Sequence, residues 1–75
     1  MNFPRMGDLL ECTESAVIFP YWDYDGEKPG WIRPGTMAIF LEERADYSND
    51  FTVFWKVITT DGKTGWAPSI SFKVL

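Results

Sequence analysis

Residues 51–75 read FTVFWKVITTDGKTGWAPSISFKVL, and this stretch has the clearest structural pattern in the chain. Phe51, Val53, Trp55 and Val57 alternate with other residues, which is the period-two pattern of a strand with one buried face. We therefore expect these four side chains to point into a core.

The same stretch continues as a hairpin. Asp61-Gly62 follows Thr59-Thr60 in a pattern typical of a two-residue turn, because both turn positions of such a hairpin need positive φ. Residues 65–68 form the expected returning strand, and Pro68-Ser69 should start a turn or a single 3₁₀ turn. A last strand is expected over residues 72–75.

Three segments upstream also suggest strands. Residues 16–19 are apolar, partly β-branched and bounded by Pro20, and residues 36–43 (TMAIFLEE) follow a turn at Arg33-Pro34-Gly35. The apolar run in the second segment predicts burial on both of its faces. A helix is the rival interpretation there, but the segment is short and follows Pro-Gly. Residues 7–12 fit either a short strand or one helical turn.

We expect the remaining segments to be loops. Residues 21–31 (YWDYDGEKPGW) and 45–50 (ADYSND) are rich in turn-forming residues. The predicted fold is therefore all-β: a small barrel of about five short strands with an aromatic-rich loop and no substantial helix, since a barrel protects strand edges in so short a chain. Residues 1–15 are a leader or an extra strand, and residues 16–75 are the barrel.

Composition argues against most catalytic and metal-binding chemistry. The 75 residues include 13 aromatic residues (six Phe, four Trp and three Tyr), one Cys and no His. Cys12 alone can form neither an intrachain disulfide nor a Cys-based metal site, and the absence of His removes the commonest general base. We expect no catalytic residues, no metal and no cofactor, and a reducing compartment such as the cytoplasm.

Charge argues against nucleic acid and membrane partners. The net charge is −4, and the seven Lys and Arg residues are scattered singly along the chain. A phosphate backbone would be repelled without a basic patch, and no apolar run is long enough to span a bilayer.

At this point the residues resemble a family. FWKVITTDGKTGWAP followed by SISFKVL resembles the C-terminal half of an SH3 domain, and Pro20-Tyr21-Trp22-Asp23-Tyr24 stands where SH3 domains carry Ala-Leu-Tyr-Asp-Tyr. The resemblance covers residues 17–75 and implies an SH3-like barrel. The end of the chain also resembles small bacteriophage proteins with SH3-like barrels, which implies a phage-encoded protein acting on a host or virion protein in the host cytoplasm.

The resemblance also implies a peptide-binding groove. Carried over to this chain, the groove would use Trp22, Tyr24, Phe54 and Pro68, with Asp23, Asp25 and Glu27 as an acidic loop that pairs with a basic residue of the peptide. Phe54 replaces the usual Trp, and Ser71 stands where SH3 domains carry a Tyr.

The residues themselves point to the same region. Tyr21, Trp22, Tyr24 and Trp31 gather in one loop beside carboxylates, a combination that suits a protein-binding surface. The alternative is that Trp22 and Trp31 cover one end of the barrel as a lid.

Other aromatic residues have simpler interpretations. We assign Trp55 and Trp66 to packing. Phe54 and Ile58 lie on the opposite face of their strand, where they are either exposed at an interface or, as we favour, covered by the N-terminal segment.

The sequence therefore predicts a non-catalytic module that binds a protein or peptide segment carrying a basic residue. The predicted binding residues are Tyr21, Trp22, Tyr24, Asp25, Glu27, Trp31, Phe54 and Pro68. Two alternatives remain: a structural subunit that buries Phe54 and Ile58 against identical subunits, and a nucleic-acid-binding or ribosome-associated small barrel, which would need a basic face.

Overall fold

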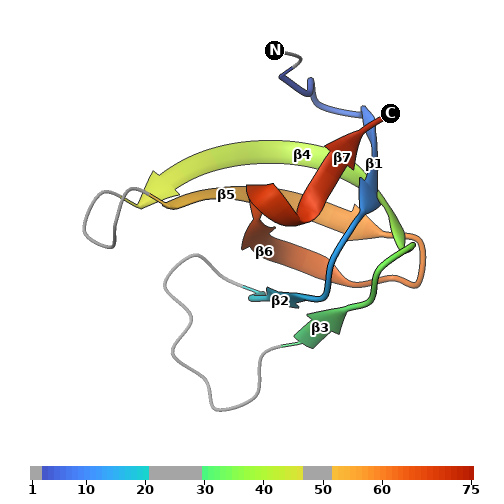
Figure 1. The fold of residues 1–75 in the computed structure, drawn as a ribbon. Coiled ribbons are helices and arrows are strands. Elements are labelled where there is room, and N and C mark those ends of the chain that lie inside the picture. The colour runs from blue at the N-terminus through green and yellow to red at the C-terminus, as the bar shows by residue number, and fades with distance from the viewer. Residues whose placement is uncertain (1–2, 21–29, 47–51) are drawn as a thin grey trace.

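The computed structural model describes residues 3–20, 30–46 and 52–75 (Figure 1). The strands are β1 (Leu9–Cys12), β2 (Ala16–Ile18), β3 (Gly30–Ile32), β4 (Met37–Asp46), β5 (Thr52–Thr59), β6 (Thr64–Pro68) and β7 (Phe72–Val74), with one 3₁₀ turn, η1 (Ser69–Ser71). This part of the chain contains no α-helix, so the all-β prediction is confirmed. The described residues therefore include no helix that is long and apolar enough to cross a membrane.

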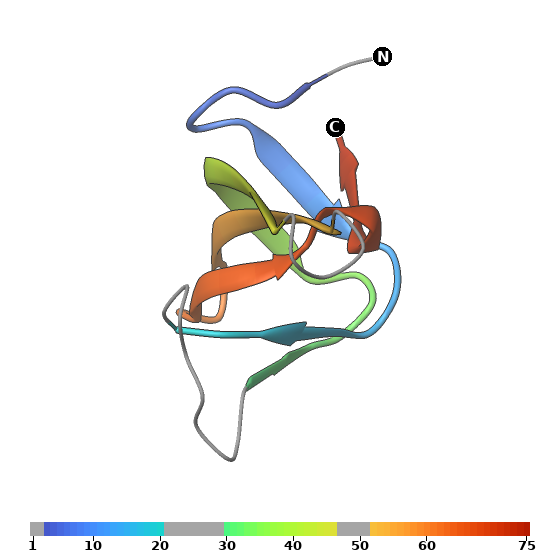
Figure 2. The same cartoon turned by 90° about the vertical axis from the view of Figure 1, so that its left-hand side faces the viewer.

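The strands form two sheets. One has five strands in the order β6-β5-β4-β1-β7, and the other pairs β2 with β3. All of the pairings are antiparallel. Figures 1 and 2 show the short β2–β3 sheet lying beside β6. We expected a closed barrel, but the two sheets are not joined into one. Their backbones are linked by the bridge between Phe19, which follows β2, and Trp66 in β6, and β2 and β3 are too short to extend it.

The long strand β4 is the centre of the larger sheet. It pairs with β5 from Ala38 to Asp46, and its first residues also pair with β1. The register with β5 shifts between Phe40 and Glu42, so Leu41 is an extra residue, a β-bulge. A bulge bends the strand and reverses the alternation of the residues beyond it. Figure 1 shows the resulting curvature of β4.

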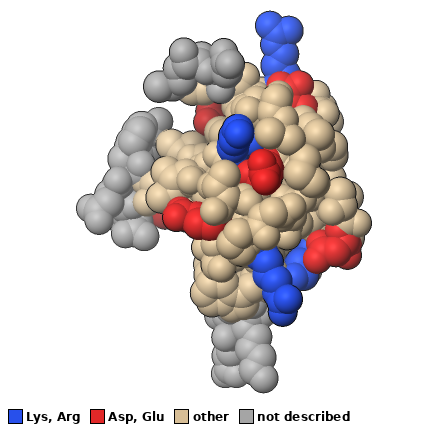
Figure 3. All heavy atoms as spheres, turned by 45° about the vertical axis from the view of Figure 1, so that its right-hand side comes forward, with Lys and Arg blue, Asp and Glu red and all other residues tan. Residues whose placement is uncertain are grey.

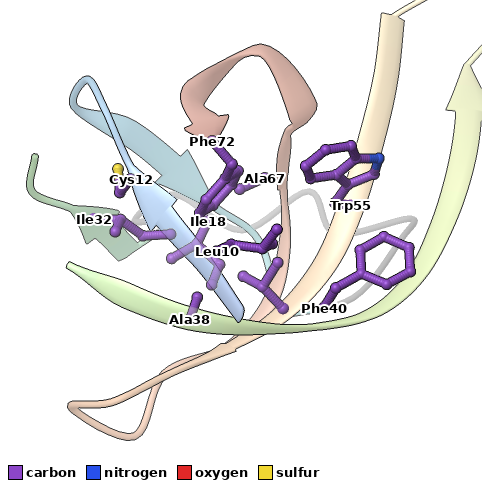
Figure 4. Close-up of a cluster of buried hydrophobic side chains, with 10 residues drawn as sticks. Leu10, Cys12, Ile18, Ile32, Ala38, Phe40, Trp55, Ala67 and Phe72 are labelled. Atoms are coloured by element: carbon purple, nitrogen blue, oxygen red, sulfur yellow. The ribbon is translucent and has the colours of Figure 1, made fainter. Parts of the chain in front are cut away.

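One face of this sheet carries the core (Figure 4). The buried cluster consists of Leu10, Cys12, Ile18, Ile32, Ala38, Phe40, Trp55, Val57, Ala67 and Phe72. The Trp55 ring meets Phe40 edge-on, with ring centroids 5.5 Å apart, and stacks on Phe72 at 6.2 Å. The prediction that alternate residues of the strand at 51–57 point to a core is confirmed for Trp55 and Val57, and Val53 packs against the cluster; Phe51 lies outside the described residues.

Strand β4 differs from its prediction in two ways. Only one face is buried, through Ala38 and Phe40, whereas Met37, Ile39 and Leu41 are half-buried on the other face. The strand also continues to Asp46 rather than ending at Glu43, because its pairing with β5 extends past the apolar run.

The hairpin between β5 and β6 has three loop residues instead of the predicted two. The Thr59 amide donates to the Lys63 carbonyl at 2.7 Å, so these two residues face each other across the hairpin. Gly62 takes a φ of +92°, and its amide donates to the Thr59 carbonyl at 3.0 Å. The Lys63 amide donates to the Thr59 hydroxyl oxygen at 2.9 Å, which adds a side-chain contact that favours the longer loop.

In the N-terminal half, the structure decides between strand and helical turn at residues 9–12 and adds a strand, β3, that we did not predict. Residues 9–12 are a strand rather than a helical turn, and Glu11 pairs with Met37 on one side and Lys73 on the other. Strand β3 lies partly within the segment that we predicted as a loop over residues 21–31. It is missing from the prediction because three residues show no periodicity, and backbone pairing with β2 creates it.

The predicted turn at Arg33-Pro34-Gly35 is present. The Thr36 amide donates to the Arg33 carbonyl at 3.1 Å, and Gly35 has a φ of +90°. Pro and then a positive-φ Gly at the two central positions are typical of a type II turn. The Gly35 amide also donates to the Cys12 carbonyl at 2.7 Å, which ties this turn to the end of β1.

The smaller sheet is held against β6 by a close backbone approach. The Phe19 and Trp66 backbones exchange two hydrogen bonds, of 2.8 and 2.7 Å. A Cβ added at Gly65 would lie 2.2 Å from the Phe19 carbonyl oxygen, so only glycine fits there.

Adjacent leucines in β1 should differ sharply in their effect on stability. Leu10 is fully buried, whereas Leu9 points away from the core, so we expect Leu10→Ala to lower the free energy of unfolding by about 2–5 kcal/mol and Leu9→Ala by less than about 1 kcal/mol. Urea denaturation at low protein concentration measures both. Equal losses would contradict the assignment of the two faces.

Gly65→Ala should separate β2 from β6. Because the new Cβ would overlap the Phe19 backbone, we expect a loss of about 3 kcal/mol or more, together with faster hydrogen exchange at the Phe19 and Trp66 amides. Gly62→Ala is the matched control: it has open space around it and a positive φ, so it should cost about 1–2 kcal/mol and leave those amides protected. Unchanged protection in Gly65→Ala would argue against the bridge.

Candidate partner-binding surface

Two of the predicted binding residues are direct neighbours. Phe54 in β5 and Pro68 in β6 are register partners, and both are half-buried. Trp55 and Ala67, the residues next to them, belong to the core cluster. Because side chains alternate along a strand, Phe54 and Pro68 lie together on the outer face of the sheet.

The bulge in β4 extends this pair into a strip. Beyond Leu41 the alternation is reversed, so Arg44 is the register partner of Phe54 on its other side, and Glu43 is opposite Trp55. Arg44, Phe54 and Pro68 thus form a strip across three strands. The sequence analysis missed Arg44, because nothing in residues 36–46 reveals a bulge.

Arg44 also covers an aromatic ring. Its guanidinium carbon lies 5.3 Å from the centroid of Trp66, a cation–π contact worth about 0.5–1 kcal/mol near a surface. Trp66 is only 5% exposed, although it lies outside the core cluster and shares the face of Pro68. Packing was the right assignment for Trp66, but the packing is on the outer face.

Trp55 is structural, as predicted. It is buried in the core, and its ring nitrogen Nε1 donates to Glu43 Oε1 at 3.0 Å. The bulge brings Glu43 to this side of β4, where its carboxylate satisfies the one polar atom of a buried indole.

Trp31 lies at a different place from the strip. It is 59% exposed in β3, so the lid interpretation is wrong for this residue. The Trp31 carbonyl accepts a hydrogen bond from Lys63 Nζ at 2.6 Å. Lys63 immediately precedes β6 and Pro68 ends it, so Lys63 is at the opposite end of β6 from Pro68, about 17 Å away along the strand.

Five predicted binding residues fall outside the described part of the chain. They are Tyr21, Trp22, Tyr24, Asp25 and Glu27. Their grouping with Trp31, Phe54 and Pro68 stays a prediction.

Ser71, which the resemblance aligns with a Tyr of SH3 domains, is buried. Ser71 is inside η1, and its carbonyl accepts hydrogen bonds from the Thr13 amide at 2.8 Å and the Thr13 hydroxyl at 3.2 Å. Ile70, the preceding residue, is 81% exposed and follows Pro68 by two positions. An exposed apolar side chain therefore follows the strip closely in sequence, and sequence reasoning missed it because a 3₁₀ turn has no apolar periodicity of its own.

Charges on the visible face do not segregate by sign. Figure 3 shows Lys and Arg side chains standing among Asp and Glu side chains on a largely uncharged surface.

Among the described residues, no group of three His, Cys, Asp or Glu residues is placed to hold a metal ion. Burial raises the pKa of the Cys12 thiol, whose sulfur donates to the Glu14 carbonyl at 2.9 Å, so this thiol stays neutral and shielded.

The hairpin tip holds a perturbed carboxylate. The Thr59 hydroxyl donates to Asp61 Oδ1, and Lys63 Nζ lies 3.9 Å from Asp61 Oδ2. The hydrogen bond from Thr59 and, after it, the positive charge of Lys63 lower the pKa of Asp61. The same Lys63 ammonium binds the Trp31 carbonyl, so the hairpin tip connects β3 to the larger sheet.

We compared the chain with protein-family models, curated proteins and solved structures, and no significant match was found.

The lowered pKa of Asp61 predicts a pH dependence of stability. A carboxylate whose folded pKa lies below its unfolded value, about 3.9, stabilises the fold above that pH and loses its contribution as the pH falls through the folded pKa. Between about pH 4 and pH 2, the free energy of unfolding should therefore fall less steeply in Asp61→Asn than in the wild type. Urea titrations at each pH measure the two slopes, and identical slopes would contradict the prediction.

Proposed function

We propose that this chain is a non-catalytic protein-binding module with an SH3-like fold, which docks a partner segment on the outer face of β5 and β6. The observation that carries the proposal is the register pairing of Phe54 with Pro68 on the face away from the core. Ile70, two residues after Pro68 in η1, is a further exposed apolar side chain. Flat or apolar side chains held on a rigid sheet suit an extended or polyproline segment, because they bury area at little entropic cost.

The arrangement of strands supports the SH3-like part of the proposal. Strand β1 lies between β4 and β7, three consecutive strands β4–β6 form meander hairpins, and the 3₁₀ turn η1 precedes the last strand. The succession of β5, β6, η1 and β7 is the one that the resemblance of residues 17–75 implies, and β1 lies outside those residues.

The partner in this proposal carries an apolar residue for the strip and a basic residue. Asp25 and Glu27 would attract the basic residue, while Tyr21, Trp22, Tyr24 and Trp31 would supply further aromatic contacts. The resemblance to bacteriophage proteins supports a host or virion protein as the partner, in the host cytoplasm. The dispersed charges and the net charge of −4 favour a protein over a nucleic acid.

Selection from a displayed library of random peptides tests the proposal. The dissociation constant of an enriched peptide, measured by fluorescence anisotropy, should rise at least about tenfold in Phe54→Ala, because a central aromatic anchor is lost. Trp22→Ala should also weaken binding while leaving the thermal unfolding temperature nearly unchanged.

Ile58→Ala is the matched control. Ile58 is on the same strand and the same face as Phe54 but four residues away, so the peptide affinity should stay within about twofold. Enriched peptides that bind Phe54→Ala as tightly as the wild type would overturn the assignment of the site, and failure to enrich any peptide above a bare-support control would overturn the proposed function.

A further inference from the structure

A second apolar surface crosses the outer face of the larger sheet, separate from the strip. Leu9 is the register partner of Ile39, and Ile39 is the register partner of Ile58. The Leu75 amide donates to the Leu9 carbonyl at 3.1 Å, which places Leu75 next to Leu9 beyond the end of β7. These four residues form a continuous row across β7, β1, β4 and β5, which we call the apolar row.

The apolar row faces away from the core. Leu10, Ala38 and Val57, which adjoin its members along the strands, are all fully buried on the opposite face. The side chains of the row are open: Leu75 is 58% exposed, Leu9 42% and Ile58 40%, while Ile39 is half-buried between its neighbours. The N-terminal segment therefore does not cover Ile58 as we had favoured; its strand β1 joins the same sheet, with β4 between β1 and β5.

Both long sides of the apolar row carry one acid and one base. On one side, Glu11 is the register partner of Lys73. On the other side, Glu42 is the register partner of Lys56. Because all four lie on the outer face, they frame the row, and the Lys56–Glu42 pair separates it from Phe54 and Arg44.

We propose that the apolar row is the contact surface for a second copy of this chain. A surface with an apolar centre and a polar rim has the anatomy of an interface. A partner of a single charge sign would meet a like charge on each side of the row. A copy related by a two-fold axis brings both signs with it, so that every acid of one rim can face a base of the other.

The size of the apolar row sets the expected dissociation constant of the dimer. A standard interface buries about 800 Å² on each partner, roughly one sixth of the 5146 Å² accessible surface of this chain. Because the four side chains of the row are at most 58% exposed, the row alone is smaller than such an interface, and we expect the dimer to be weak. We expect a dissociation constant between about 1 µM and 1 mM.

The wild-type protein gives the first test. Sedimentation equilibrium from about 10 µM to a few mM should show a monomer–dimer equilibrium, and the NMR amide shifts that depend on concentration should map to Leu9, Ile39 and Ile58. A monomer throughout this range, or shifts that map to another surface, would overturn the proposal.

Point variants give the second test. Ile58→Lys should weaken dimerisation at least about tenfold, because it places a charge in the apolar centre. Ile70→Lys is the matched control: Ile70 is the more exposed isoleucine but lies in η1, outside the row, so dimerisation should be unchanged. Circular dichroism confirms that both variants fold, and equal weakening by both would overturn the proposal.

Charge reversal gives a test that does not depend on which rim residues meet. One variant combines Glu11→Lys with Glu42→Lys, so that its rims are wholly basic, and the other combines Lys56→Glu with Lys73→Glu, so that its rims are wholly acidic. Each alone should be monomeric, and an equimolar mixture should form heterodimers that weaken as salt is raised. A mixture that stays monomeric while the wild type dimerises would show that the rims are not the contact.

Dimerisation through the apolar row is independent of peptide binding at the strip. Peptide binding uses Phe54 and Pro68, and dimerisation uses the apolar row. The Ile58→Lys variant should therefore lose dimerisation and keep its peptide affinity, so failure of either proposal is visible independently of the other.

Discussion

The extra residue in β4 is the constraint on which both faces of the sheet depend. With regular alternation, the residues beyond Phe40 would keep the phase set by Ala38, and Arg44 would point toward the core side. Leu41 shifts that phase. As a result, Glu43 meets the indole nitrogen of Trp55 on one face, while Arg44 lies against Phe54 and Trp66 on the other. One inserted residue therefore completes the polar contacts of the core and creates the charged end of the strip.

The small size of the chain explains why the outer face is so apolar. A chain of 75 residues has a large surface relative to its volume, and its single core occupies only one face of the larger sheet. Among the residues that the structure describes, no second layer of strands lies over the apolar row, yet the outer face carries leucine and isoleucine there. Trp66, on the same face, is buried, and the Arg44 guanidinium lies over its ring.

The sequence predicted those elements whose signals are local. The alternation at Val53, Trp55 and Val57, the Pro68-Ser69 turn and the Arg33-Pro34-Gly35 turn all appear as expected. The features that it did not predict arise from contacts between distant segments. Strand β3 exists through pairing with β2, the bulge at Leu41 is visible only against β5, and the third loop residue of the hairpin follows from the Thr59 side chain. For the site, the resemblance grouped Phe54 with Pro68, but the pairing of Arg44 with Phe54 and the exposure of Ile70 needed the three-dimensional structure.

The pairing of β1 with β7 joins the two ends of the chain. Cys12 faces Phe72 across this ladder, 60 residues apart in sequence (72 − 12). Closing so long a loop costs entropy before any of the pairing is gained, which places the chain among slow-folding, high-contact-order topologies. During synthesis, β1 leaves the ribosome first and must wait for the last strand. Until then its edge and the side chains of Leu10 and Cys12 stay open, and the nascent chain depends on its local hairpins for structure.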